Sequence, residues 1–292
     1  MSTDIQSEKV SIAGGSAQRR VGIGSFAYRY AIGFRGFNPG KRMLIGDFLQ
    51  TAADGGWKGV QLCENLGYAD LSDSDLAAVA AQAKRLQLFV EIGLHGLTER
   101  NLNRHLDVAE IFGSDLIRVV LGETGIEESL KILRSARQRL LSQRIRLGLE
   151  NHFDLTMGEL LGIVRQLDDQ QFGIVFDTTN GLGFLERPQE ELVKAQPYLI
   201  SMHIKDYTVR KVEAGYFVTG AVLGKGMLDV PAVLCCASGA PNFRSIILEM
   251  TVKRDESAAV AAVIRREQAA VLESRDYLVQ ELSKIPSFRC NS

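Results

Sequence analysis

The chain has 292 residues, 46% of them hydrophobic and 24% charged, a composition usual for a soluble globular protein with one large domain or two small ones. Its formal net charge of −1 argues against a surface that coats nucleic acid, because such surfaces carry a basic excess. No apolar stretch reaches the roughly 18 residues of a membrane span, so the sequence predicts neither a nucleic-acid-binding nor a membrane protein.

The N-terminal segment is polar and lacks the hydrophobic core of a signal peptide. Arg19 and Arg20 do not make a twin-arginine export signal, because the next ten residues carry Arg29 and two tyrosines. We predict a flexible tail over residues 1–20 and a single domain over residues 21–292.

Eight short runs of apolar and β-branched residues follow the tail. Their ends lie 26 to 46 residues apart, which is the repeat that a strand followed by a helix requires. We therefore predict eight strands. They cover residues 21–26, 59–63, 89–94, 116–122, 146–151, 172–177, 199–204 and 245–250.

The segments between these strands have helical periodicity, most clearly at 75–87, 101–113, 128–143 and 156–169. Buried strands that alternate with helices indicate a parallel sheet whose outer face is covered. Eight such units predict the α/β class and a single (β/α)8 TIM barrel. A dinucleotide site is not expected, because VGIGSFAY after the first strand lacks the third glycine of the fingerprint.

Polar residues stand at the ends of four successive strands. In a barrel of this type the active site lies at the carboxyl ends of the strands, where the ends converge. Three carboxylates packed together there would repel one another unless a cation lies among them. The sequence therefore predicts a divalent metal site. Its expected ligands are Glu150, Asp177, His203 and Glu249.

This set of ligands is rich in oxygen and contains no thiolate. It favours Mn²⁺, Mg²⁺ or Co²⁺ in a roughly octahedral site, and Zn²⁺ tolerates it. The residue types alone do not choose among these ions.

The motifs LGLEN, FDTTN, HIKD and ILEM, together with LGKGMLD at 223–229, resemble the xylose isomerase-like TIM barrel superfamily. More narrowly, the chain is similar to its sugar phosphate isomerase/epimerase branch, whose members include ketose 3-epimerases, hydroxypyruvate isomerases and inosose dehydratases. The resemblance covers nearly the whole chain after residue 20.

The resemblance implies that the four strand-end residues bind one metal ion, and that Glu150 and Glu249 are the catalytic bases. One glutamate would remove a proton beside a carbonyl of a sugar or keto-polyol, through a metal-stabilised enediolate, and the other would return it. A lyase is the alternative, because the same groups would expel a β-hydroxyl, as in dehydration of an inosose, or cleave a 3-keto-glycoside. The chain departs from ketose epimerases at Asn180, where they carry histidine. They also tend to have an arginine some residues after the metal histidine, whereas this chain has Lys205 and Asp206 first.

Several further polar residues are expected at the barrel mouth. Lys205 follows the metal histidine by two positions, and His152 follows Glu150 by two, so strand alternation directs both toward the substrate. Each also has a structural alternative, namely a salt bridge for Lys205 and helix capping for His152. The candidates for substrate binding are His152, Lys205, Asn180, Glu64 and His95.

Other residues are expected to be structural. Glu91 and Arg118 are predicted to form an ion pair inside the barrel, and Asn151 to bond loop backbone. Trp57 is expected to pack, and His105, which lies within a helix, is expected to be a surface or packing residue. The long connection between strands seven and eight contains glycines that would let it fold over the mouth. The aromatic candidates for stacking on a sugar are Tyr28, Phe153 and Phe184.

Two other classes of function are disfavoured by the residues. Apurinic endonucleases share the superfamily, but their zinc site needs many histidines and this chain has four. A non-catalytic sugar-binding barrel would be expected to have lost at least one metal ligand. The cysteines form no CxxC pair, which favours a reduced, cytoplasmic location. The expected partner is a small carbohydrate, and a homo-oligomer is left open.

Overall fold

The computed structural model describes residues 19–288. The predicted tail over residues 1–20 lies outside the described residues except for its last two, and Arg20 is already the first residue of strand β1. None of the described helices combines the length and the apolar character that crossing a bilayer requires.

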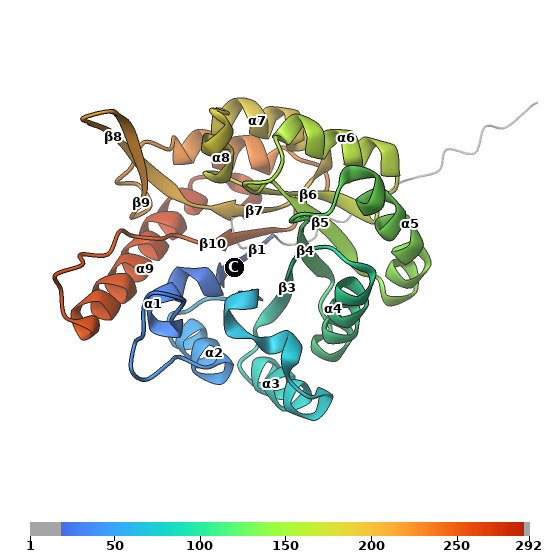
Figure 1. Cartoon of the computed structure of the whole chain (residues 1–292), viewed down its shortest axis with the longest axis horizontal. Coiled ribbons are helices and arrows are strands. Elements are labelled where there is room, and N and C mark those ends of the chain that lie inside the picture. The colour runs from blue at the N-terminus through green and yellow to red at the C-terminus, as the bar shows by residue number, and fades with distance from the viewer. Residues whose placement is uncertain (1–18, 289–292) are drawn as a thin grey trace, which may run out of the picture.

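Eight parallel strands form a closed barrel in the order β1-β10-β7-β6-β5-β4-β3-β2 (Figure 1). The prediction of a (β/α)8 TIM barrel is confirmed, and each strand lies within two residues of its expected bounds. The barrel strands are β1 (Arg20–Gly24), β2 (Gly59–Leu62), β3 (Phe89–His95), β4 (Leu116–Val120), β5 (Arg146–Glu150), β6 (Phe172–Asp177), β7 (Leu199–Ile204) and β10 (Ser245–Leu248).

Helices surround the barrel as an outer layer (Figure 1). The local sequence determines where three of these helices begin. The side chains of Ser72, Thr98 and Thr156 accept hydrogen bonds from backbone N–H groups in the first turns of α3, α4 and α6. The helices are α1 (Arg29–Ile32), α2 (Ile45–Asp54), α3 (Asp73–Arg85), α4 (Glu99–Phe112), α5 (Ile126–Gln143), α6 (Met157–Leu167), α7 (Pro188–Ala195), α8 (Val230–Ser238) and α9 (Val260–Ser283).

The packing predictions for two residues are confirmed. His105 is buried on α4, where its ring contacts Tyr68 edge-on and bonds the carbonyl of Asn101 in its own helix. Trp57 is buried at the turn before β2.

The long connection after β7 contains an antiparallel hairpin of β8 (Asp206–Val212) and β9 (Gly215–Ala221), which projects from the barrel (Figure 1). The Asp206 carboxylate holds the base of this connection, because it accepts hydrogen bonds from the backbone N–H groups of Gly224, Gly226 and Leu228. The glycines of LGKGM therefore wrap one buried aspartate, which fixes where the hairpin leaves the barrel.

The hairpin also packs closely against the segment after β10. A Cβ at position 220 would overlap the carbonyl oxygen of Thr251, so only glycine permits this approach. The connection after β7 thus lies against the segment that follows β10.

Candidate active site

Four ionisable side chains meet at the carboxyl ends of β5, β6, β7 and β10, which are neighbours in the barrel. Glu150, Asp177, His203 and Glu249 are all buried, and one ligand atom from each lies within 4.8 Å of the others. Nδ1 of His203 is 3.3 Å from Oε1 of Glu150 and 3.5 Å from Oε2 of Glu249. The structure therefore brings together all four of the expected ligands.

The donor set suits a metal ion. Both ring nitrogens of His203 are buried without a hydrogen-bond partner among the described residues, which is costly for an imidazole with no further partner. Asp177 is oriented for the same centre, because its Oδ1 accepts hydrogen bonds from the N–H groups of Thr179 and Asn180 while its Oδ2 faces the cluster. Three carboxylates and one imidazole are the hard, oxygen-rich set that divalent ions prefer.

Two buried cations accompany the three carboxylates. Nε of Arg118 lies 3.0 Å from Oε2 of Glu150. Nζ of Lys205 lies 2.6 Å from Oδ2 of Asp177 and 2.8 Å from Oε2 of Glu249. When His203 is neutral, as a metal ligand must be, the two cations leave one of the three carboxylate charges uncompensated, so the cluster attracts a further cation.

The cations also set the protonation of the cluster. Burial alone would raise the pKa of the Glu150 carboxyl, but His203 and Arg118 outweigh it and hold that pKa well below its usual range. Burial would lower the pKa of the Lys205 ammonium, but Asp177 and the neighbouring carboxylates raise it instead. Glu150 is therefore an ionised, weakly basic carboxylate, and Lys205 stays charged.

The predicted ion pair between Glu91 and Arg118 is wrong. The neighbour of Arg118 on β3 is Gly93, and Glu91 lies two residues nearer the amino end of that strand, about 7 Å lower in the barrel. Glu91 instead accepts hydrogen bonds from Ser245 and Gln61. The glycine at position 93 makes room for the Arg118 side chain, since a Cβ there would lie 2.9 Å from Nη2 of Arg118. This glycine is the feature of the sequence that could have indicated where Arg118 lies.

Two asparagines position candidate ligands. Asn151 accepts a hydrogen bond from the backbone N–H of Asp177 and donates one to its carbonyl, so the prediction that Asn151 bonds backbone is confirmed. Asn180, a candidate for substrate binding, is buried and donates to Oε1 of Glu150 at 3.2 Å. Its amide therefore orients the candidate ligand Glu150.

The remaining candidates lie around the rim. The rings of His95 and His152 pack edge-on with centroids 5.7 Å apart, and Glu64 is exposed with its carboxylate 3.6 Å from Arg118. Tyr28 is not at the rim, which corrects its prediction as a stacking residue. It is 3% exposed and packs against Phe48, because the short helix after β1 turns it into the core.

A cavity of about 290 Å³ opens beside the cluster. Lys205 lines it and joins it to Asp177 and Glu249. Phe153 also lines it, as expected of a stacking candidate, whereas Phe184 does not belong to its lining. Hairpin residues 218–220 close one side. The cavity offers a mixed polar and apolar surface next to the four candidate ligands.

Comparison with known proteins places the chain among enzymes. The family model of the xylose isomerase-like TIM barrel matches residues 49–266. The 3-oxo-isoapionate decarboxylase of Pectobacterium atrosepticum is 26% identical over 264 residues, which cover 88% of this chain and 94% of that relative.

Two solved structures share the fold. A xylose isomerase-like TIM barrel protein from Mycobacterium smegmatis in complex with magnesium matches with a TM-score of 0.70 at 15% identity, over 93% of this chain and 98% of that one. D-psicose 3-epimerase in the presence of D-fructose matches with a TM-score of 0.66 at 15% identity, over 89% and 99%. With its closed eight-stranded barrel and the matched family model, the chain belongs to the xylose isomerase-like TIM barrel family.

Proposed function

We infer that the chain is a divalent-metal-dependent isomerase or epimerase of a keto sugar or keto-polyol. The observation that carries this proposal is the buried quartet of Glu150, Asp177, His203 and Glu249, in which one ligand atom from each residue lies within 4.8 Å of the others. These residues would hold one ion, with Mn²⁺, Mg²⁺ or Co²⁺ favoured by the oxygen-rich set. Such an ion supplies positive charge beside a substrate carbonyl, where negative charge develops.

The chain's own groups would then move the proton. A carboxylate oxygen of Glu249 or Glu150 takes the proton from the carbon next to the carbonyl, and the electron pair of that C–H bond forms the enediolate. Return of the proton to the other face gives an epimer, and its return to the neighbouring carbon gives an isomer. Lys205, between Asp177 and Glu249, provides a fixed cation beside the developing oxyanion.

Substrate binding is assigned to the cavity next to the cluster. Phe153 offers a ring face, and Lys205 offers an ammonium group. His95, His152 and Glu64 are proposed as contacts from the opposite rim, where they follow β3, β5 and β2. Asn180 is proposed to act through Glu150, which it contacts.

A lyase is the second candidate, and one observation favours it. Glu150 is paired with Arg118 at 3.0 Å, and this cation weakens the basicity that a proton-transferring glutamate needs. Cleavage of a C–C bond next to the carbonyl, as in decarboxylation, needs no such base, because the bond's electron pair forms the enolate directly. The relative that is 26% identical is a decarboxylase.

Two measurements test the proposal. Purified protein should contain or bind one divalent ion per chain, and the double variant Glu150→Gln/Glu249→Gln should bind at least tenfold less tightly. Glu128→Gln, an exposed glutamate on α5, is the matched control. Undiminished metal binding by the double variant would contradict the site.

Solvent deuterium exchange separates the two reactions. Incubation in D2O with a panel of ketoses and keto-polyols should place deuterium beside the carbonyl if the chain is an isomerase or epimerase. Release of carbon dioxide or loss of a substituent, without exchange into recovered substrate, would support the lyase instead. If neither occurs with the ion bound, the proposed proton transfer is wrong.

A further inference from the structure

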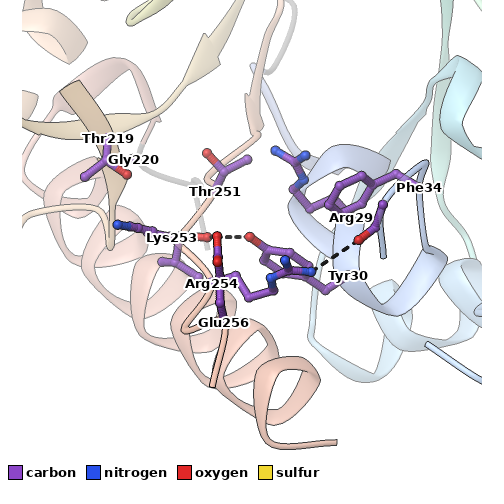
Figure 2. A pocket seen from close by; sticks show the side chains of 11 residues that line it. Arg29, Tyr30, Phe34, Thr219, Gly220, Thr251, Lys253, Arg254 and Glu256 are labelled. Atoms are coloured by element: carbon purple, nitrogen blue, oxygen red, sulfur yellow. Dashed lines mark hydrogen bonds between the residues drawn. The ribbon is translucent and has the colours of Figure 1, made fainter. Parts of the chain in front are cut away.

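A second cavity, of about 300 Å³, lies where three connections at the carboxyl ends of the strands meet (Figure 2). Arg29 comes from α1 after β1, Lys253 and Arg254 follow β10, and Gly220 belongs to β9. Figure 2 shows the three cationic side chains around the cavity from different sides. Glu256 is the one carboxylate in its lining, so the surface carries a net positive charge.

These cations make no close ion pair, although Arg29 acts from further away to lower the pKa of the Glu267 carboxyl. Within residues 19–288, no ion pair of 4 Å or less involves Arg29, Lys253 or Arg254. The clustering of three unpaired cations costs electrostatic energy, and an anion between them would remove that cost. Guanidinium groups in particular present several N–H donors to carboxylate or phosphate oxygens.

Aromatic rings hold the cations in place. The guanidinium of Arg29 lies 4.3 Å from the ring centre of Phe34, and the ammonium of Lys253 lies 5.2 Å from that of Phe217 on β9. Such contacts restrict the side chains but leave their polar hydrogens free, because the interaction uses the ring face and no acceptor. Arg29 and Lys253 are thus held near the cavity with donors still available, while Arg254 donates from one guanidinium nitrogen to the carbonyl oxygen of Gly36 and has further N–H groups to offer.

The cationic cavity adjoins the cavity next to the metal cluster. Thr219, Gly220 and Thr251 line both. Thr251 follows Glu249 by two residues, so their Cα atoms are at most about 7 Å apart. A ligand that places its carbonyl beside Glu249 can therefore extend toward the cations across this shared boundary.

We propose that Arg29, Lys253 and Arg254 bind an anionic group of the substrate, so that the substrate is an acidic or phosphorylated keto sugar. This inference rests on the proposed function, because that function is what makes the bound anion part of a substrate. The anion is a carboxylate or a phosphate ester, and both match the donors in the cavity.

Anion binding can be measured independently of the metal. Isothermal titration of the full chain with inorganic phosphate and with glycolate, with the divalent ion and after chelation, should give binding of at least one probe in both states. Lys253→Gln should weaken it at least tenfold. Lys253 is exposed, so this variant is expected to stay folded even if Arg29→Gln does not. Tighter binding of phosphate would identify a phosphate ester, and tighter binding of glycolate an acid.

Lys211→Gln is the matched control, because Lys211 is exposed on β8 and does not line the cavity. It makes the same change of net charge and should bind the probes as wild type does. Failure of both probes to bind wild type would overturn the proposal. Equal affinity in Lys253→Gln and wild type, or an equal loss in Lys211→Gln, would also overturn it.

A turnover assay connects the cavity to the substrate. For a ketose that carries a carboxylate or a phosphate, Lys253→Gln should raise KM at least tenfold. The ratio of kcat/KM for this ketose to kcat/KM for an uncharged ketose should fall by a similar factor in the variant. An unchanged ratio would show that the bound anion is not part of the substrate. If no ketose reacts at all, the proposed function fails, while the titration still decides whether the cavity binds anions.

Discussion

Arg118 Nε lies 3.0 Å from Oε2 of Glu150, and the two side chains are only 2% and 3% exposed. This buried pair joins Arg118 on β4 to Glu150, the candidate metal ligand at the end of β5. Removal of one partner leaves the other as an uncompensated buried charge, which is much more costly than the loss of a surface pair.

Arg118→Met should therefore lower the free energy of unfolding by about 3–5 kcal/mol in the absence of metal. A divalent ion should restore part of that loss, because it returns positive charge beside Glu150 and binds only the folded state. Urea unfolding with and without the ion measures both effects. Arg139→Gln, which breaks a partly exposed pair with Asp107, is the control and should cost about 1 kcal/mol or less.

Asn151 is expected to control metal affinity without touching the ion. Its side chain bonds both the N–H and the carbonyl of Asp177, so Asn151→Ala releases the backbone that aims this ligand. Residues that orient ligands typically contribute 10- to 100-fold to affinity, and we expect a loss of about that size. Competition with a metal indicator dye measures it. Asn103→Ala, at an exposed site on α4, should have no effect, and equal affinity of both variants would contradict the role of Asn151.

Glu267 on α9 predicts a specific pH dependence of stability. Its buried carboxylate accepts hydrogen bonds from the N–H groups of Tyr30 and Ala31, and burial raises its pKa to about 7. Because the folded state then binds the proton more tightly than the unfolded state, stability from this group is highest at low pH and falls as pH rises from about 4.5 to about 7. The shift corresponds to an effect on the order of 3 kcal/mol.

Urea unfolding of wild type and Glu267→Gln from pH 5 to 8 tests this dependence. The amide does not titrate, so the stability advantage of wild type over the variant should shrink as pH rises. Other ionisable groups are common to both proteins and cancel in the difference. A difference that stays constant with pH would show that Glu267 does not titrate in this range.

Two glycines should respond to alanine in opposite directions. Gly220→Ala places a Cβ against the backbone of Thr251, so the hairpin must shift, and we expect a loss of about 1–3 kcal/mol with faster amide exchange in β8 and β9. Gly162→Ala, in α6 with nothing within 4 Å of the new Cβ, should stabilise by about 0.5–1 kcal/mol. Unchanged amide exchange in the hairpin of Gly220→Ala would show that this contact does not hold it.

The barrel and the four-residue cluster could be predicted from the sequence because both depend on local order along the chain. Alternation of apolar runs with helical periods identifies a parallel barrel, and parallel strands bring their carboxyl ends to one face. The polar residues that end LGLE, FGIVFD and LISMH were therefore bound to share that face, with Glu249 one residue beyond β10.

The partners of buried groups were not predictable in the same way. Arg118 and Glu91 both point into the barrel, and the stagger between strands decides that one reaches Glu150 and the other Ser245. Tyr28 was expected at the rim, but the short helix after β1 buries it. The glycines of the long connection predicted a loop that could fold over the mouth, but the hairpin of β8 and β9 within it was not predicted.

The sequence by itself thus determined the architecture, the strand ends and the chemical character of the central cluster, because these follow from periodicity and from the order of residues along each strand. Only the tertiary structure decided that Arg118 and Lys205 neutralise two of the three carboxylates. It also decided that Arg29 and Lys253, more than 200 residues apart, line one cavity. Such contacts depend on the tilt and stagger of the strands and on the packing of their connections, which are set by the closure of the whole barrel and by no single segment.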